Sequence, residues 1–128
     1  MLLSMLQEKN HLSYLFIYHN MAVVYYFCQR VAVMYLGRIV EQGSVDEIFD
    51  DPLHPYTHLL REASPIPDHA LRKAAVNLEG EVASAVNPPS GCYFHPRCQH
   101  CMDICHKEYP AWTTITEERG VACHLVNH

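Results

Sequence analysis

The sequence predicts an α/β fold in two parts: the closing end of an α/β domain over residues 1–63, and a loop-rich, cysteine-containing extension over residues 64–128. Two observations support this division. The first part is apolar and periodic, and its patterns follow a strand–helix–hairpin–helix order. The second part opens with residues 64–98, which hold five of the eight prolines of the chain. Prolines at this density are typical of loops and turns.

Apolar patterns predict the first elements of the chain. Residues 1–9 fit the end of a helix. Residues 13–18 (SYLFIY) are typical of a strand buried on both faces of a parallel sheet. A short helix fits 21–29, and Cys28 within it is expected to be a small core residue. The strand at 13–18 needs neighbours on both sides, and the sequence offers too few strands to supply them.

A hairpin and two helices are predicted next. The stretch VAVMYLGRIVEQG (31–43) reads as two strands joined at Gly37. Ser44 and the glutamate three positions later form a capping box, which begins a short helix. A second helix is predicted for 54–63, because a proline is tolerated at a first helical position. His54 and His58 share a face of this helix, and we expect His54 to cap it, since no HExxH zinc motif is present.

The charge and the apolar stretches of the sequence argue against two kinds of partner, nucleic acid and the interior of a membrane. The 128 residues are 49% hydrophobic, and the net charge is −5 at pH 7. The nine lysines and arginines form no basic run, which argues against nucleic-acid binding. The longest apolar stretch, 14–28, is too short for a membrane-spanning helix, which needs about 20 apolar residues. No targeting segment is recognisable, so we expect a cytoplasmic protein without a membrane span.

Several stretches together resemble one known family. They are LFIYHNMAVV, RVAVMYLGRIVE, IFDDPLHPYTHLL, NPPSGCYFHPRC and VACHL. The chain resembles the C-terminal part of the ATP-binding subunit of ABC transporters, in the branch that imports oligopeptides and dipeptides. The resemblance covers essentially the whole chain, and HPYT and GCYFHPRC are its most specific elements. It implies that the chain is the truncated end of a P-loop NTPase (ABC ATPase) domain, followed by the extension of this transporter branch.

The resemblance identifies His19 as the switch histidine. In the family this residue contacts the terminal phosphate of ATP and helps to place the attacking water. Tyr18 and Asn20 replace the usual serine and aspartate around it. The sequence contains no P-loop GxxxxGK[ST], no Walker B strand and no LSGGQ signature. We therefore expect the chain alone to be inactive, with ATP and Mg²⁺ bound only by an intact family member.

The resemblance also implies partners and a location. An intact family member would hydrolyse ATP on the cytoplasmic side, together with a second ATPase subunit and membrane permease subunits. We accordingly expect a cytoplasmic location, peripheral on the inner face of the cell membrane. The rival hypothesis is a free-standing zinc or iron–sulfur binding module with no role in transport.

Five of the six cysteines lie between positions 92 and 123. Thiols are kept reduced in the cytoplasm, so this cluster favours a metal over disulfides. The resemblance implies that Cys92, Cys98, Cys105 and Cys123 bind a four-iron four-sulfur cluster, and four thiolates do saturate such a cluster.

Cys101 lies outside that pattern and opens a zinc alternative. With Cys98 it forms a Cys-x2-Cys pair, and Cys105 with either Cys123 or His124 would complete a tetrahedral zinc set. Other side chains are expected to support the site by ordering its loop, offsetting its charge or excluding water. These are His95, Arg97, Tyr109 and Trp112.

Overall fold

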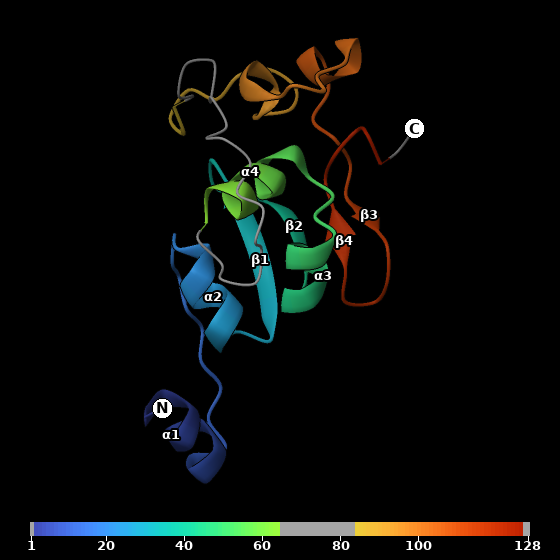
Figure 1. The fold of residues 1–128 in the computed structure, drawn as a ribbon. Helices are drawn as coiled ribbons and strands as arrows, with labels where there is room; N and C mark the ends of the chain where they lie inside the picture. The colour runs from blue at the N-terminus through green and yellow to red at the C-terminus, as the bar shows by residue number, and fades with distance from the viewer. Residues whose placement is uncertain (1, 65–83, 127–128) are drawn as a thin grey trace.

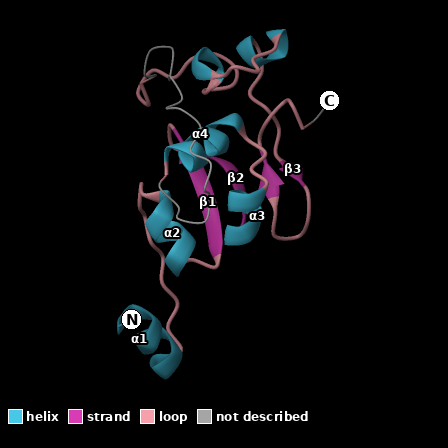
Figure 2. Ribbon diagram, viewed as in Figure 1, coloured by secondary structure: helices cyan, strands magenta, loops and turns pink. Residues whose placement is uncertain are grey.

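The computed structural model describes residues 2–64 and 84–126, and its centre is an antiparallel sheet of four strands in the order β1-β2-β4-β3 (Figures 1 and 2). The strands are β1 (Arg30–Tyr35), β2 (Arg38–Ser44), β3 (Thr113–Thr114) and β4 (Gly120–Val121). The α-helices are α1 (Leu2–Asn10), α2 (Met21–Phe27), α3 (Val45–Asp50) and α4 (Pro55–Ala63). Two 3-10 turns, η1 (His95–Arg97) and η2 (Asp103–His106), follow in the cysteine-bearing segment. The predicted helix at the start and the α/β class are confirmed.

The predicted hairpin forms β1 and β2. Leu36 and Gly37 both have positive φ, 47° and 79°, as a two-residue turn of the primed type requires. Tyr35 and Arg38 are paired on either side of this turn. The tight turn places the end of the hairpin directly below the cysteine-bearing segment, at the top of Figure 1.

The helices begin where local capping chemistry predicts. The backbone N–H of Glu47 donates to Ser44 Oγ at 3.2 Å, and the backbone N–H of Ser44 donates to Glu47 Oε2 at 2.9 Å. The predicted capping box of α3 is therefore confirmed. Asn20 caps α2, because its Oδ1 accepts the N–H of Ala22 at 2.9 Å. Asparagine is a preferred N-cap residue, so Asn20 directly before α2 is a signal for this cap that the sequence itself contains.

His54 caps α4 from a buried position. Its Nδ1 accepts the backbone N–H of Tyr56 at 3.0 Å, and its side chain is 1% exposed. The predicted capping role is confirmed. Burial, with a smaller contribution from the charge of His58, lowers the pKa of His54 to about 4. The imidazole is therefore neutral at pH 7, as a nitrogen that accepts a hydrogen bond must be.

A buried carboxylate joins three parts of the fold. Glu41 is 0% exposed and accepts the backbone N–H groups of Leu53, at 3.0 and 3.1 Å, and of His54, at 2.9 Å. Arg119, in the turn between β3 and β4, lies 3.7 Å from the same carboxylate. Arg119 also donates to the carbonyl oxygen of Asp51. Glu41 thus ties β2 to the segment that enters α4 and to the last hairpin.

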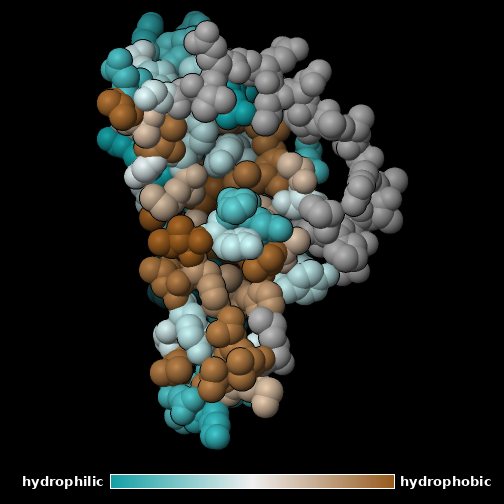
Figure 3. Space-filling view, turned by 90° about the vertical axis from the view of Figure 1, so that its left-hand side faces the viewer, coloured by the Kyte–Doolittle hydropathy of each residue, from teal (hydrophilic) through white to brown (hydrophobic). Residues whose placement is uncertain are grey.

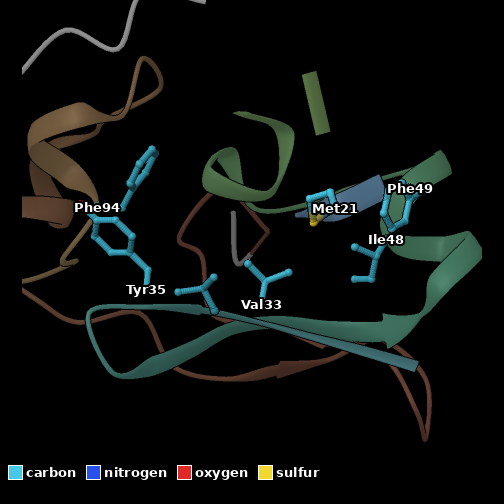
Figure 4. Packing of buried hydrophobic residues seen from close by; sticks show 7 residues of the cluster. Met21, Val33, Tyr35, Ile48, Phe49 and Phe94 are labelled. Atoms are coloured by element: carbon cyan, nitrogen blue, oxygen red, sulfur yellow. The ribbon is translucent and has the colours of Figure 1, made fainter. Parts of the chain in front are cut away.

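Residues 84–126 complete the sheet and the core that residues 2–64 begin. β4 pairs with β2, and the N–H of Ala122 donates to the carbonyl of Val40 at 2.8 Å. Phe94 is 2% exposed, and its ring centroid lies 5.3 Å from that of Tyr35. Figure 4 shows the buried side chains between the sheet and its helices: Met21, Val33, Tyr35, Ile48, Phe49 and Phe94.

The predicted strand at 13–18 is wrong in this structure. Residues 11–20 are all exposed, and Leu15 and Ile17 are 90% and 91% exposed. No strand of the described ranges pairs with this segment, and the sheet is antiparallel rather than parallel. A buried strand needs neighbours for its N–H and C=O groups, and here it has none. Figure 3 shows apolar surface running from the middle of the molecule down toward the end that α1 occupies in Figure 1, with hydrophilic residues at the tip.

Within residues 2–64 and 84–126, no helix is long and apolar enough to cross a membrane.

The neutral His54 makes stability depend on pH. The unfolded chain takes up a proton near pH 6.5, whereas folded His54 does so only near its lowered pKa of about 4. Stability from this site is complete above pH 6.5 and is lost as the pH falls through about 4, up to about 3 kcal/mol. Urea unfolding at pH 7, 6 and 5 measures this loss. His54→Asn keeps an N-cap acceptor but cannot titrate, so its stability should fall less than that of the wild type over this range. Parallel pH profiles would contradict the assignment.

Candidate functional site

The cysteine-bearing segment, residues 90–126, is held together by backbone contacts. The N–H of Cys92 donates to the carbonyl of Cys105 at 2.8 Å, and Ser90 Oγ donates to the carbonyl of His106 at 2.9 Å. Gly91, between these contacts, has φ +71°, and a Cβ there would overlap the carbonyl oxygen of Cys105. Only glycine allows the two backbones to approach in this way.

Arg38 connects this segment to the hairpin turn. Its guanidinium carbon lies 4.3 Å from the ring centroid of Tyr109 and 5.2 Å from that of Tyr93. The two rings meet edge to face, with centroids 5.1 Å apart. Such cation–π contacts stabilise by about 0.5–2 kcal/mol each. Tyr109 thus packs on Tyr93, the residue that follows Cys92, and burial raises the pKa of Tyr109.

Four thiols lie within electrostatic reach of one another. Burial, with smaller contributions from Cys92, Cys98 and Cys105, raises the pKa of Cys123 to about 11. Burial likewise raises the pKa values of Cys92 and Cys98, with Cys105 contributing to both. The thiols of Cys92, Cys98 and Cys123 are therefore protonated at pH 7.

Backbone amides also act on these sulfurs. For Cys92, Cys98 and Cys123, the amide two residues further along the chain lowers the pKa, against the larger effect of burial. For Cys105 the donor is the amide of Met102, at 3.4 Å. Amides directed at sulfur lower its pKa and favour the thiolate form, which is the form that ligates metals.

Cys101 has different partners. Its sulfur lies 3.5 Å from His106 Nε2 and donates to the carbonyl of Met102 at 3.6 Å. His124, the other member of the zinc alternative, has its Nε2 2.8 Å from the carbonyl oxygen of Glu108. A ring nitrogen facing a carbonyl carries the proton, which leaves Nδ1 as the nitrogen of His124 with a lone pair. Cys101 also lies close to other thiols, since Cys105 and Cys98 contribute, after burial, to its raised pKa.

The donor chemistry suits a metal, but the spacing does not form a closed site. Within residues 2–64 and 84–126, no three His, Cys, Asp or Glu side chains are placed to hold a metal ion. The predicted iron–sulfur and zinc sites are accordingly not supported as formed sites.

The supporting side chains have mixed outcomes. His95 Nδ1 lies 2.7 Å from the carbonyl of Cys92, and its ring packs against His106 at 4.5 Å, so His95 orders the cysteine loop as expected. Trp112 was expected to cover the cysteines, and this prediction is wrong. Its indole lies against Gly120 of β4, and the side chain is 42% exposed. Pairing of β3 with β4 carries Trp112 to the sheet instead.

His19 lies apart from the sheet, in the exposed segment that leads to α2. Its ring stacks on that of Tyr18, with centroids 5.2 Å apart and planes 15° from parallel. It directly precedes Asn20, the N-cap of α2. The side chain of His19 is exposed.

Comparison with known proteins gives a consistent picture. A model of the oligopeptide/dipeptide transporter C-terminal region matches residues 40–105. The matched range includes Glu41, His54, Cys92, Cys98 and Cys105, whereas His19 and Cys123 lie outside it.

Individual relatives extend the similarity to most of the chain. A probable peptide ABC transporter ATP-binding protein, y4tS of Sinorhizobium fredii, is 51% identical over 97% of this chain and 35% of its own length. The oligopeptide transport ATP-binding protein OppF of Escherichia coli is 50% identical over 85% of this chain and 33% of its own length. The oligopeptide transport ATP-binding protein AppF of Bacillus subtilis is 40% identical over 97% of this chain and 38% of its own length. The chain spans about a third of the length of these curated relatives.

The close approach at Gly91 can be tested by substitution. Gly91→Ala combines left-handed strain with backbone overlap, so we expect a loss of roughly 2–5 kcal/mol in unfolding free energy. Reaction with a thiol reagent should also become faster, because the loop that buries Cys92 and Cys105 opens. Gly37→Ala is the matched control: its φ is +79°, nothing lies within 4 Å, and it should cost only about 1–2 kcal/mol. Equal effects of the two substitutions on stability and thiol reactivity would contradict the packing described.

Proposed function

Because the chain belongs to the oligopeptide/dipeptide transporter family, whose C-terminal region it carries, we propose that it serves as the C-terminal part of the ATP-binding subunit of a peptide importer. The match over residues 40–105 is the observation on which this proposal rests. The same range contains the Glu41 and His54 interactions that position α4. The relatives are named as ATP-binding proteins of peptide transport, which does not favour a free-standing metal-binding module.

His19 is the proposed switch histidine of this subunit. Its exposure beside the N-terminus of α2 supports the role, since an accessible imidazole can hydrogen-bond a phosphate oxygen. ATP and Mg²⁺ would be held by the P-loop and Walker B elements of the intact subunit, because the 128 residues contain neither. His19 therefore acts as an accessory to a site that this chain does not complete alone.

The proposed partners are a second ATPase subunit and two membrane permeases, at the inner face of the cell membrane. The exposed apolar side chains of α1 and residues 11–18 support assembly with other protein surface. Surfaces of this kind are uncommon on proteins that act alone.

Cys92, Cys98, Cys105 and Cys123 are the proposed ligands of an iron–sulfur cluster. The shared electrostatic reach of these thiols and their amide donors support this choice. A bound cluster would link the loop that carries Cys92 to the end of the chain at Cys123. The zinc set with Cys101 is the alternative: the Cys101 sulfur lies 3.5 Å from His106 Nε2, and Cys105 and Cys98 contribute, after burial, to its raised pKa.

A chimera tests the transport proposal. We expect OppF of Escherichia coli to retain peptide uptake when this chain replaces its aligned C-terminal third, because the two are 50% identical there. His19→Ala in the chimera should lower ATP hydrolysis at least about 100-fold, the range for loss of a catalytic electrostatic contact. His11→Ala, in the same exposed segment, serves as the control and should leave hydrolysis unchanged. A chimera that folds and assembles but does not transport would argue against the family role, and an active His19→Ala chimera against the switch role.

Metal loading tests the cysteine proposal. After anaerobic reconstitution, we expect about four irons and four sulfides per chain and a broad visible absorption band. Cys98→Ser or Cys105→Ser should abolish the band, because each would remove one of only four ligands. Cys101→Ser and Cys28→Ser are controls that should retain it. One zinc without iron, released by Cys101→Ser, would show that the zinc set is the correct one.

A further inference from the structure

The N-terminal arm of the chain, defined here as α1 and residues 11–18, stands away from the core. No residue of α1 is buried, and residues 11–18 are all exposed. Figure 1 shows α1 at the opposite end of the molecule from the cysteine-bearing segment, joined to α2 by an extended stretch. Isolated helices shorter than about 12–15 residues are marginal in water, and α1 has nine. The arm therefore has little packing support within the described part of the chain.

The apolar area of the arm is large enough for a protein interface. Ten of its large apolar side chains are exposed, from 36% for Leu6 to 91% for Ile17. Aromatic side chains bury about 150–250 Å² each and aliphatic ones somewhat less, so these ten, weighted by exposure, present on the order of 800–1,000 Å². The largest apolar patch of a typical monomer is about 300–600 Å². The arm exceeds that range and reaches the roughly 800 Å² that each partner contributes to a specific interface.

The extended part of the arm already has two faces, as a strand does. The ring centroids of Tyr14 and Phe16 lie 5.8 Å apart, so these side chains lie on one side of the segment. Side chains at every second position of an extended chain share a face, which places Leu15 and Ile17 on the other side. Leu15 and Ile17 are 90% and 91% exposed. Their face is the most exposed apolar part of the arm.

Charge decides which occupant fits this surface. Residues 1–20 contain one acidic and one basic side chain, Glu8 and Lys9, so the arm has no net charge. The rest of the chain carries the whole net charge of −5. Two copies therefore repel each other through their other surfaces but not through their arms. A strongly charged partner would find no complementary patch on the arm, whereas a second copy offers a surface that is equally apolar and equally neutral.

We propose that two copies of this chain associate through their arms. Most homodimers have twofold symmetry, in which the same surface of each copy meets its counterpart. A twofold axis perpendicular to the segment brings residues 13–18 of the two copies together as antiparallel strands, which supplies partners for their backbone N–H and C=O groups. The side chains of Leu15 and Ile17 become cross-strand neighbours, and the α1 helices of the two copies cover them.

This association does not rest on the proposed transport function, because it needs neither ATP nor another subunit. The arm is also the surface that supports assembly into a transporter. The two associations therefore exclude each other, and pairing holds the chain out of the transporter.

Sedimentation equilibrium of the 128-residue chain tests the proposal, with a reducing agent present so that no disulfide forms. We expect a reversible equilibrium between the 14.7 kDa chain and a species of twice that mass. Hydrogen exchange at residues 13–18 should slow as the concentration rises, because antiparallel pairing protects their amides. A chain that is monomeric at every concentration, or that forms larger assemblies without a dimer, would overturn the proposal. A monomer that binds full-length OppF of Escherichia coli would identify an ATP-binding subunit as the occupant instead.

Variants locate the contact. Leu15→Asp and Ile17→Asp each bring like charges together across the paired strands, so each should weaken association at least about tenfold. Neither should change the unfolding midpoint of the monomer, since both side chains are exposed in it. Val86→Asp is the matched control, because Val86 is 94% exposed but lies outside the arm, and it should associate as the wild type does. Equal weakening by Ile17→Asp and Val86→Asp, or none by Leu15→Asp and Ile17→Asp, would show that the arm is not the contact.

Discussion

The buried carboxylate of Glu41 is the interaction on which the arrangement of this protein depends. It accepts three hydrogen bonds from the backbone that enters α4 and attracts Arg119 of the last hairpin. Without these partners a carboxylate at 0% exposure would be strongly unfavourable, and breaking a buried charge pair typically costs about 3–5 kcal/mol. Satisfying this one charge connects the segment that enters α4 and the β3–β4 hairpin to β2.

Two further contacts carry that arrangement to the cysteines. Phe94 enters the core beside Tyr35, and Arg38 at the hairpin turn packs on Tyr93 and Tyr109. Both contacts fix residues next to Cys92, which is itself bonded to Cys105. The β1–β2 hairpin therefore helps to position the residues around Cys92. Arg38 and Cys92 are far apart in the sequence, but only Tyr93 lies between them in this chain of contacts.

Local rules predicted the local structure. The capping box at Ser44, the turn at Gly37 and the histidine cap of α4 all follow from contacts within a few residues. The role of Glu41 could not be predicted in this way, because its partners lie 12 and 13 residues away and in a separate hairpin. The strand expected at 13–18 failed for the same reason: apolar composition indicates burial, but pairing depends on neighbours that local sequence does not reveal. The grouping of four cysteines came from the family resemblance, because five cysteines within a short segment allow more than one set of four.

The backbone amides that act on the cysteine sulfurs restrict which residue type can occupy three positions of the chain. Where a cysteine accepts the N–H two residues later, proline is forbidden at that later position, since it has no N–H to give. The positions concerned are 94, 100 and 125, here Phe, His and Leu, although this part of the chain contains Pro88, Pro89, Pro96 and Pro110. The rule can be read from any related sequence without a structure. A relative that keeps its cysteines but places proline at one of these three positions has lost the support of that sulfur.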